Sequence, residues 1–123
     1  MGLIYKEVEL IGIKGQRSIR ALFDTGASES FVRRDIAEEI TSLIKLSEPK
    51  TFEAPVGKIQ TQLAIIPDIA LNGHRLFWTL IVVDGLTEEA ILGADFFQRW
   101  KIRLEPETEN IMWDVQALKL KLI

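Results

Sequence analysis

The sequence contains no cysteine and only one histidine, His74. The lack of cysteine excludes a disulfide-stapled scaffold, a zinc site built on thiolates and a cysteine nucleophile. A single histidine cannot form a zinc site by itself, and it leaves a Ser/His/Asp triad only one candidate base. We therefore expect no metal and no cofactor, and a chemistry that rests mainly on carboxylates and hydroxyl groups.

The chain also lacks an excess of positive charge and a long hydrophobic run. Its 15 basic and 18 acidic residues give a formal net charge of -3, without a basic cluster. Nucleic acid is therefore not an expected partner. The longest apolar run, residues 76–83, is too short to span a bilayer, and residues 1–7 reach charge too early for a signal peptide. These absences predict no membrane partner and a cytoplasmic location.

What the sequence does contain is enough apolar material for a core. Hydrophobic residues make up 47% of the 123 residues, and we expect one domain spanning residues 1–123. Most of the pattern has the period of two that is typical of strands. The expected strands and hairpins lie at residues 4–13, 18–23, 50–62 with a turn near 54–58, 69–78 around Asn72-Gly73, 102–104 with 111–113, and 118–122.

Two segments have a helical pattern instead. Ile36, Ile40, Leu43 and Ile44 recur at helical spacing, which predicts one amphipathic helix over residues 33–44, with Ser30 as its N-cap. Residues 94–100 predict a second, short helix. The fold class is therefore mostly β with two helices.

The segment with the clearest chemical content is an apolar strand that ends on Asp24 and continues as Thr25-Gly26. The strand places the carboxylate on a rigid element, and the glycine permits a sharp turn. Taken alone, an Asp before Thr-Gly is more often a turn residue than a catalytic one. A second short motif follows later in the chain, where Ile91-Leu92 precedes Gly93 and the second expected helix.

In this combination the sequence resembles the retropepsin-like aspartic proteases, over roughly residues 8–113. The resemblance implies a single-lobe acid-protease β-barrel in which Asp24 is catalytic. Thr25, Gly26 and Ala27 would support the active site, and Thr25 would bond across a subunit interface. The residues implied to bind substrate are Leu22, Ala27, Ser28 and Ile91, together with Pro55, Val56 and Gly57 in a flap over the cleft.

The number of Asp-Thr-Gly motifs is decisive for the expected assembly. Hydrolysis by this chemistry requires one ionised and one protonated carboxyl group on the same water. Only Asp24 has the required setting; Asp68, Asp84, Asp95 and Asp114 are predicted to be turn or cap residues. The second carboxylate must therefore come from a second copy of the chain, so we expect a homodimer.

Some positions depart from the retroviral pattern. Ser28 and Ala94 stand where retroviral members usually carry an Asp–Arg ion pair, so the dimer must be secured differently, for example by the terminal strands. The acidic residues Glu29, Glu88 and Glu89 are expected near the ends of the cleft. There they would favour basic or neutral peptide side chains, although a solvated surface role fits them equally well.

The leading hypothesis is a homodimeric aspartic endopeptidase that acts on peptide or protein substrates. The alternative is a non-catalytic dimeric peptide-binding module that retains the fold and binds an extended strand without cutting it. A third hypothesis is a protease domain that belongs to a larger processing system. The sequence does not distinguish this possibility from a stand-alone enzyme.

Overall fold

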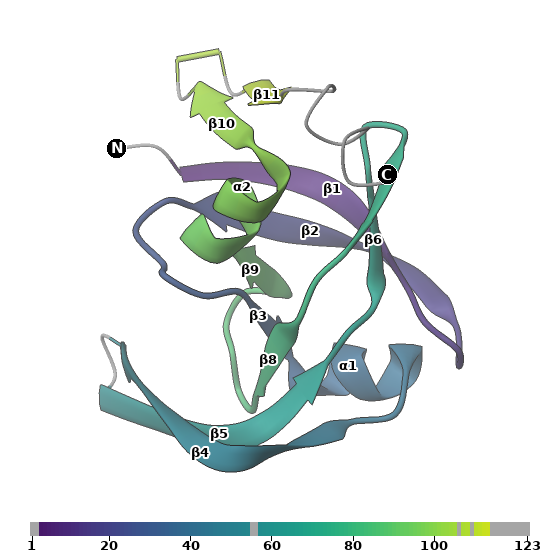
Figure 1. Ribbon diagram of the computed structural model, residues 1–123, viewed down its shortest axis with the longest axis vertical. Helices are drawn as coiled ribbons and strands as arrows, with labels where there is room; N and C mark the ends of the chain where they lie inside the picture. Colours follow the sequence, from purple (N-terminus) through teal and green to yellow (C-terminus); the bar gives the residue numbers. More distant parts are fainter. Residues whose placement is uncertain (1–2, 55–56, 106, 109, 114–123) are drawn as a thin grey trace.

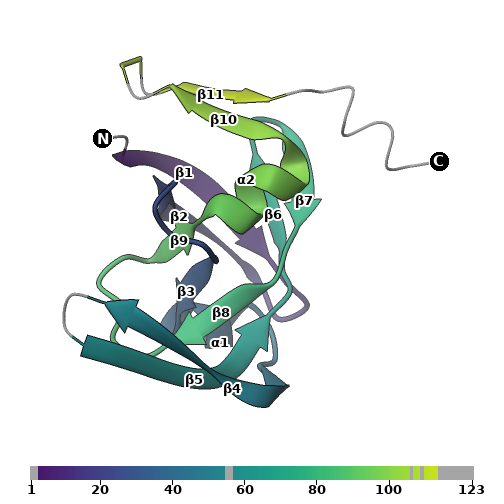
Figure 2. The same ribbon diagram turned by 60° about the vertical axis from the view of Figure 1, so that its left-hand side comes forward.

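The structure is a computed structural model that describes residues 3–54, 57–105, 107–108 and 110–113. Within these residues the chain forms eleven strands and two helices (Figures 1 and 2). In chain order they are β1 (Leu3–Ile11), β2 (Gln16–Asp24), β3 (Phe31–Arg33), α1 (Arg34–Ile40), β4 (Ile44–Ala54), β5 (Gly57–Ile65), β6 (Asp68–Leu71), β7 (His74–Phe77), β8 (Leu80–Val83), β9 (Ala90–Leu92), α2 (Ala94–Trp100), β10 (Ile102–Glu105) and β11 (Asn110–Trp113).

Nine of the strands form one sheet in the order β4-β5-β8-β3-β9-β2-β1-β6-β7. The mostly β class predicted from the sequence is confirmed, but the expected barrel is not closed. β4 and β7 are the two edges of this sheet, and no pairing joins them among the described residues. In Figure 1 the β4–β5 hairpin, at one edge of the sheet, lies along the bottom of the molecule, and β6, the neighbour of the other edge strand β7, lies on its right side.

The main core lies between the central strands and the two helices. α1 buries Ile36, Ala37 and Ile40, and α2 buries Phe96, Phe97 and Trp100. Phe97 stacks on Phe23 of β2, with ring centroids 5.9 Å apart. Because β2 is fastened to the core directly before its last residue, the end of this strand is a rigid position.

The first helix is shorter than predicted. It covers Arg34–Ile40 and not residues 33–44, because the backbone at Thr41 is extended (φ -162°, ψ 174°) and Ile44 already belongs to β4. Leu43 still packs against the core, but from an extended segment. The predicted N-cap is also wrong: Arg33 occupies the cap position, and Ser30 is buried elsewhere. The second predicted helix, residues 94–100, is confirmed.

The predicted hairpins are present with small changes of boundary. β6 and β7 pair in register across Asn72-Gly73, where both residues have positive φ (50° and 81°), as a two-residue primed turn requires. β4 and β5 form a longer hairpin than expected. β10 and β11 form a separate two-stranded sheet. The predicted strand 118–122 lies outside the described residues.

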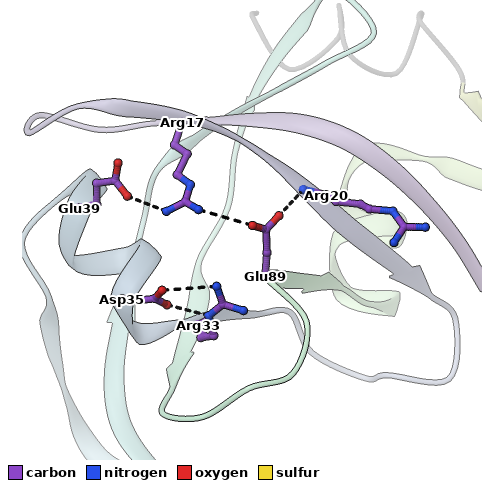
Figure 3. A network of polar contacts seen from close by, with 6 residues as sticks. All are labelled: Arg17, Arg20, Arg33, Asp35, Glu39 and Glu89. Carbon is purple, nitrogen blue, oxygen red and sulfur yellow. Dashed lines mark hydrogen bonds and ion pairs between the residues drawn. The ribbon is translucent and has the colours of Figure 1, made fainter.

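A polar network on the surface fastens the start of β9 to β2 (Figure 3). Glu89 accepts a hydrogen bond of 2.7 Å from the backbone N–H of Arg20, and its other carboxylate oxygen lies 3.6 Å from a guanidinium nitrogen of Arg17. Arg17 also pairs with Glu39 of α1 at 2.9 Å. The Glu89 carboxylate thus adds one hydrogen bond between the two segments, next to the last backbone pair of β2 and β9.

Neither helix in the described part of the chain has the length and apolar character needed to cross a membrane.

Candidate active site

Asp24 is the last residue of β2, and it is half-buried. The two residues before it, Leu22 and Phe23, are buried and pair with β9. On the other side Asp24 pairs with Leu3 at the start of β1. Flanking strands on both sides leave the backbone of Asp24 little freedom, so its carboxylate is held at a defined place on the surface.

The turn after Asp24 aims its amide groups back at this residue. The N–H of Gly26 donates a hydrogen bond of 2.8 Å to Asp24 Oδ1, and the N–H of Ala27 donates one of 3.1 Å to the Asp24 carbonyl oxygen. Thr25, Gly26 and Ser28 are exposed, and Ala27 is half-buried. The arrangement orients the carboxylate and leaves its surroundings open to water or to another protein surface.

β9 lies between β2 and β3 in the sheet, and the residues that follow it contact this turn. It runs parallel to β2, with Leu22 opposite Ile91, and antiparallel to β3, with Phe31 opposite Ile91. Beyond β9, the N–H of Ala94 donates a hydrogen bond of 2.7 Å to the Ala27 carbonyl oxygen. The two sequence motifs, one around Asp24 and one around Gly93, therefore meet in the fold.

Sequence reasoning missed a second connection to the same turn, made by Ser30 and Asp95. Ser30 is completely buried; its hydroxyl donates to Asp95 Oδ1 at 2.8 Å and accepts the N–H of Gly93 at 3.0 Å. Asp95 was predicted to be a turn or cap residue. It does accept the N–H of Phe96, but it also accepts the indole N–H of Trp78 at 2.8 Å. No local sequence signal reveals these contacts, because the partners are far apart in the chain.

An apolar row extends from Asp24 across the sheet. Leu22 is 7% exposed, and Ile91 and Phe31 are half-buried. The register places them side by side on neighbouring strands, and Leu22 shares the face of Asp24 because residues two apart on a strand point the same way. Leu22 and Ile91 were among the predicted substrate-binding residues. Phe31 was not, because its place opposite Ile91 depends on the pairing of β3 with β9.

The β4–β5 hairpin corresponds to the segment expected to act as a flap. Gly57, at the start of β5, is exposed and has φ +124°, so a side chain there would be strained. Pro55 and Val56 lie outside the described residues. Lys50 of β4 forms an ion pair of 3.4 Å with Glu29, which lies in the turn of residues 24–30 that carries Asp24. This ion pair connects the hairpin strand to the turn.

The three acidic residues expected at the ends of the cleft all have partners. Glu29 pairs with Lys50, Glu88 accepts the hydroxyl of Tyr5 at 2.9 Å, and Glu89 bonds Arg20 and Arg17. The bond to Glu88 raises the pKa of the Tyr5 phenol, and burial raises it further. These carboxylates serve structural contacts within the chain, which weakens the case that they select basic substrates.

No group of three or more carboxylate and histidine side chains in the described ranges is placed to hold a metal ion. Asp24 is accompanied instead by backbone amides, the exposed hydroxyl of Thr25 and the apolar row. A lone carboxylate in such a setting is suited to proton transfer, as general acid or general base, once a substrate or a second acidic group is beside it.

Comparison with known proteins agrees with this geometry. The family model described as "gag-polyprotein putative aspartyl protease" matches residues 11–99. Among solved structures, the crystal structure of the retroviral protease-like domain of Ddi1 from Leishmania major superposes with a TM-score of 0.71 at 16% sequence identity, covering 93% of this chain and 90% of that one. That likeness supports the fold, and the family match extends over most of the chain, including Asp24 and Gly93. The chain therefore belongs to the retroviral-type aspartyl protease family.

Proposed function

We propose that this chain is a homodimeric aspartic endopeptidase in which Asp24 of each protomer acts on one shared water molecule. The observation that carries the proposal is the setting of Asp24. It ends a buried strand, its carboxylate accepts the Gly26 amide, and the Thr25-Gly26 turn beside it is exposed. Such a carboxylate is fixed in direction and still accessible to a partner.

The chemistry explains why a second copy is needed. One carboxylate must draw a proton from the water while a protonated one polarises the scissile carbonyl. Two ionised carboxylates about 3 Å apart repel by roughly 5 kcal/mol at an effective dielectric constant near 20. The pair would therefore share one proton over a broad pH range, and a single site would hold both the base and the acid.

Exposed apolar side chains beside Asp24 and on β11 support self-association. Leu3, which pairs with Asp24, is 56% exposed, and Met112 of β11 is 42% exposed. β10 and β11 form a two-stranded sheet apart from the main sheet; Ile102, Leu104 and Ile111 pack against the core, which leaves Met112 exposed on the outer side. A second copy packed against these strands would cover the apolar side chains and bring the two Asp24 turns together around a twofold axis.

The proposed substrate is an extended peptide lying along the apolar row of Leu22, Ile91 and Phe31. The β4–β5 hairpin would cover it, with Gly57 close to the peptide; Pro55 and Val56, outside the described residues, are kept from the sequence as proposed peptide-binding residues. Ala27 and Ser28 would supply backbone and hydroxyl contacts beside the cut site. Because the row is apolar and the nearby acidic groups are occupied, we expect preference for uncharged, apolar side chains at the cleaved bond.

The test combines Asp24→Asn with subunit mixing. Asp24→Asn should abolish cleavage of an unbiased peptide library and leave folding intact. Mixing equal amounts of wild-type and variant chains should reduce activity per wild-type chain by about half, because random pairing places half of the wild-type chains in mixed dimers. The matched control is Asp68→Asn, which removes a carboxylate paired with Arg75 on β7, a strand outside the site.

Three results would contradict the proposal. Full activity in Asp24→Asn would exclude this residue as the acid–base group. Activity per wild-type chain that is unaffected by mixing, with exchange of subunits verified, would exclude a shared site. Peptide binding without turnover at any pH, unchanged in Asp24→Asn, would favour the non-catalytic binding module.

A further inference from the structure

The turn that carries Asp24 is held at its far end by a polar cluster around Ser30. Ser30 is fully buried. Its hydroxyl donates to the carboxylate of Asp95 and accepts the N–H of Gly93. A buried hydroxyl with both functions satisfied is a well-determined contact, because an alternative orientation would leave a donor or an acceptor unpaired in the interior.

Asp95 connects this contact to two further elements. Its Oδ1 accepts the Ser30 hydroxyl and the N–H of Phe96, both at 2.8 Å, and its Oδ2 accepts the indole N–H of Trp78 at 2.8 Å. Trp78 lies in the connection between β7 and β8, and Phe96 lies in α2. One carboxylate thus joins the end of the Asp24 turn, the start of α2 and the β7–β8 connection.

We propose that Asp95 is a positioning residue for the Asp24 carboxylate and acts through Ser30. Residues 24–30 are fastened in the middle by the backbone bond from Ala94 to Ala27 and at the end by the Ser30–Asp95 bond. The first attachment joins two backbone atoms, whereas the second can be released by removing a hydroxyl or a carboxylate without adding any atom. The inference rests on the proposed function, because it concerns the alignment of Asp24 for catalysis.

The twofold arrangement would increase the effect of a small shift. Any displacement of the turn in one protomer is repeated in its partner, so the separation of the two Asp24 carboxylates would change from both sides. Alignment errors of about 1 Å can reduce a catalytic rate by as much as roughly a hundredfold without a change in the groups that react. We therefore expect loss of this contact to lower kcat more than it raises KM.

Asp95→Ala is the substitution that releases the contact from the side of α2. It removes the carboxylate that accepts from Ser30, Phe96 and Trp78. Asp95→Asn would be less decisive, because an amide oxygen that faces Ser30 and Phe96 keeps both of those bonds and only the bond from Trp78 is lost. Ser30→Ala releases the same contact from the side of the turn.

The experiment is a double-mutant cycle on kcat with Ser30→Ala, Asp95→Ala and the double variant, and Asp68→Ala as the matched control. We expect each single variant to lower kcat about tenfold or more with KM within about threefold. The kcat of the double variant should lie within about twofold of that of the less active single variant. Multiplicative losses in the double variant, or losses entirely in KM, would overturn the proposal.

A second measurement does not depend on activity. Amide hydrogen exchange of residues 24–30 should accelerate in Ser30→Ala and Asp95→Ala, while exchange of the strand amides in β1 and β6 stays unchanged. In Asp68→Ala, exchange of residues 24–30 should stay at the wild-type rate. Unchanged exchange at residues 24–30, or acceleration across the whole protein, would overturn the positioning role. If the wild-type protein cleaves no peptide, the proposed function fails and the exchange measurement still decides whether Asp95 holds the turn.

Discussion

The Cα atom of Gly93 lies directly against the carbonyl oxygen of Ala27. A Cβ atom at Gly93 would lie 2.5 Å from that oxygen and 2.4 Å from the carbonyl oxygen of Glu29. Both are backbone atoms of the turn that carries Asp24, so they cannot move aside as a flexible side chain could. The close approach allows the hydrogen bond from Ala94 to Ala27 to form, and thereby fixes the turn against the start of α2.

Gly93→Ala should therefore be strongly destabilising. We expect a loss of about 3 kcal/mol or more in the free energy of unfolding, measured by denaturant titration, because the new methyl group overlaps backbone atoms. Gly15→Ala is the control, since its Cβ would meet only the Glu39 carbonyl oxygen at 3.6 Å, an ordinary contact. Equal stability of the two variants would show that the turn does not need this close approach.

The side chain of Glu89, which is 30% exposed, should contribute measurably to stability through the contacts drawn in Figure 3. Glu89→Ala removes the acceptor of the Arg20 backbone N–H and the contact with Arg17, and we expect a cost of about 1 kcal/mol. Glu89→Gln, which keeps an acceptor, should cost less. Glu38→Ala, which removes an exposed pair with Arg34 within α1, should cost below about 0.5 kcal/mol. A loss in Glu38→Ala as large as in Glu89→Ala would contradict this ranking.

Tyr5 is the single tyrosine of the chain, so its titration can be followed directly by ultraviolet absorbance. Its hydroxyl donates to Glu88, and ionisation would lose this bond and place a phenolate beside a carboxylate; the pKa of Tyr5 is therefore raised. Since the folded pKa exceeds the unfolded one, the stabilisation is fully present below about pH 10 and is lost as the pH rises through the folded value. Glu88→Gln should lower the pKa of Tyr5. An unchanged titration in that variant would assign the shift to burial alone.

Phe31 should influence which peptides are cleaved, if the proposed function is right. Its ring meets Phe52 of β4 edge-on, with centroids 4.9 Å apart, and lies opposite Ile91 in the sheet. Phe31→Leu shortens the side chain, and we expect the cleavage profile of a peptide library to shift toward bulkier apolar residues. Phe77→Leu, at a position 55% exposed on β7, is the control and should leave the profile unchanged. Identical profiles for Phe31→Leu and wild type would exclude Phe31 from the substrate cleft.

Several features of the fold could be predicted because their causes are local. The Asn72-Gly73 turn follows from two residues that adopt positive φ readily. The short helix at residues 94–100 follows from apolar residues at helical spacing. The pairing of residues 102–104 with 111–113 follows from alternation on either side of a turn. In each case neighbours in the chain are also neighbours in space.

The errors arose where distant contacts override the local pattern. Leu43 and Ile44 continue the helical spacing of Ile36 and Ile40, but the chain becomes extended at Thr41 and Ile44 enters β4, which pairs with β5. Ser30 is of a residue type that commonly caps helices, yet its hydroxyl donates its hydrogen bond to Asp95. A local rule cannot anticipate either outcome, because the competing partners are supplied by segments 20 or more residues away.

The amino-acid sequence by itself determined the mostly β class, the family and the candidate acid, because these depend on periodicity and on two short motifs whose residue types have few substitutes. Only the tertiary structure decided what surrounds that acid: the sheet that stays open, Phe31 beside Ile91, the occupied acidic groups, and the Ser30–Asp95 contact. The physical reason is that strand register and side-chain hydrogen bonds join segments that are far apart in the chain. No local pattern in either segment indicates that the two lie close together in the fold.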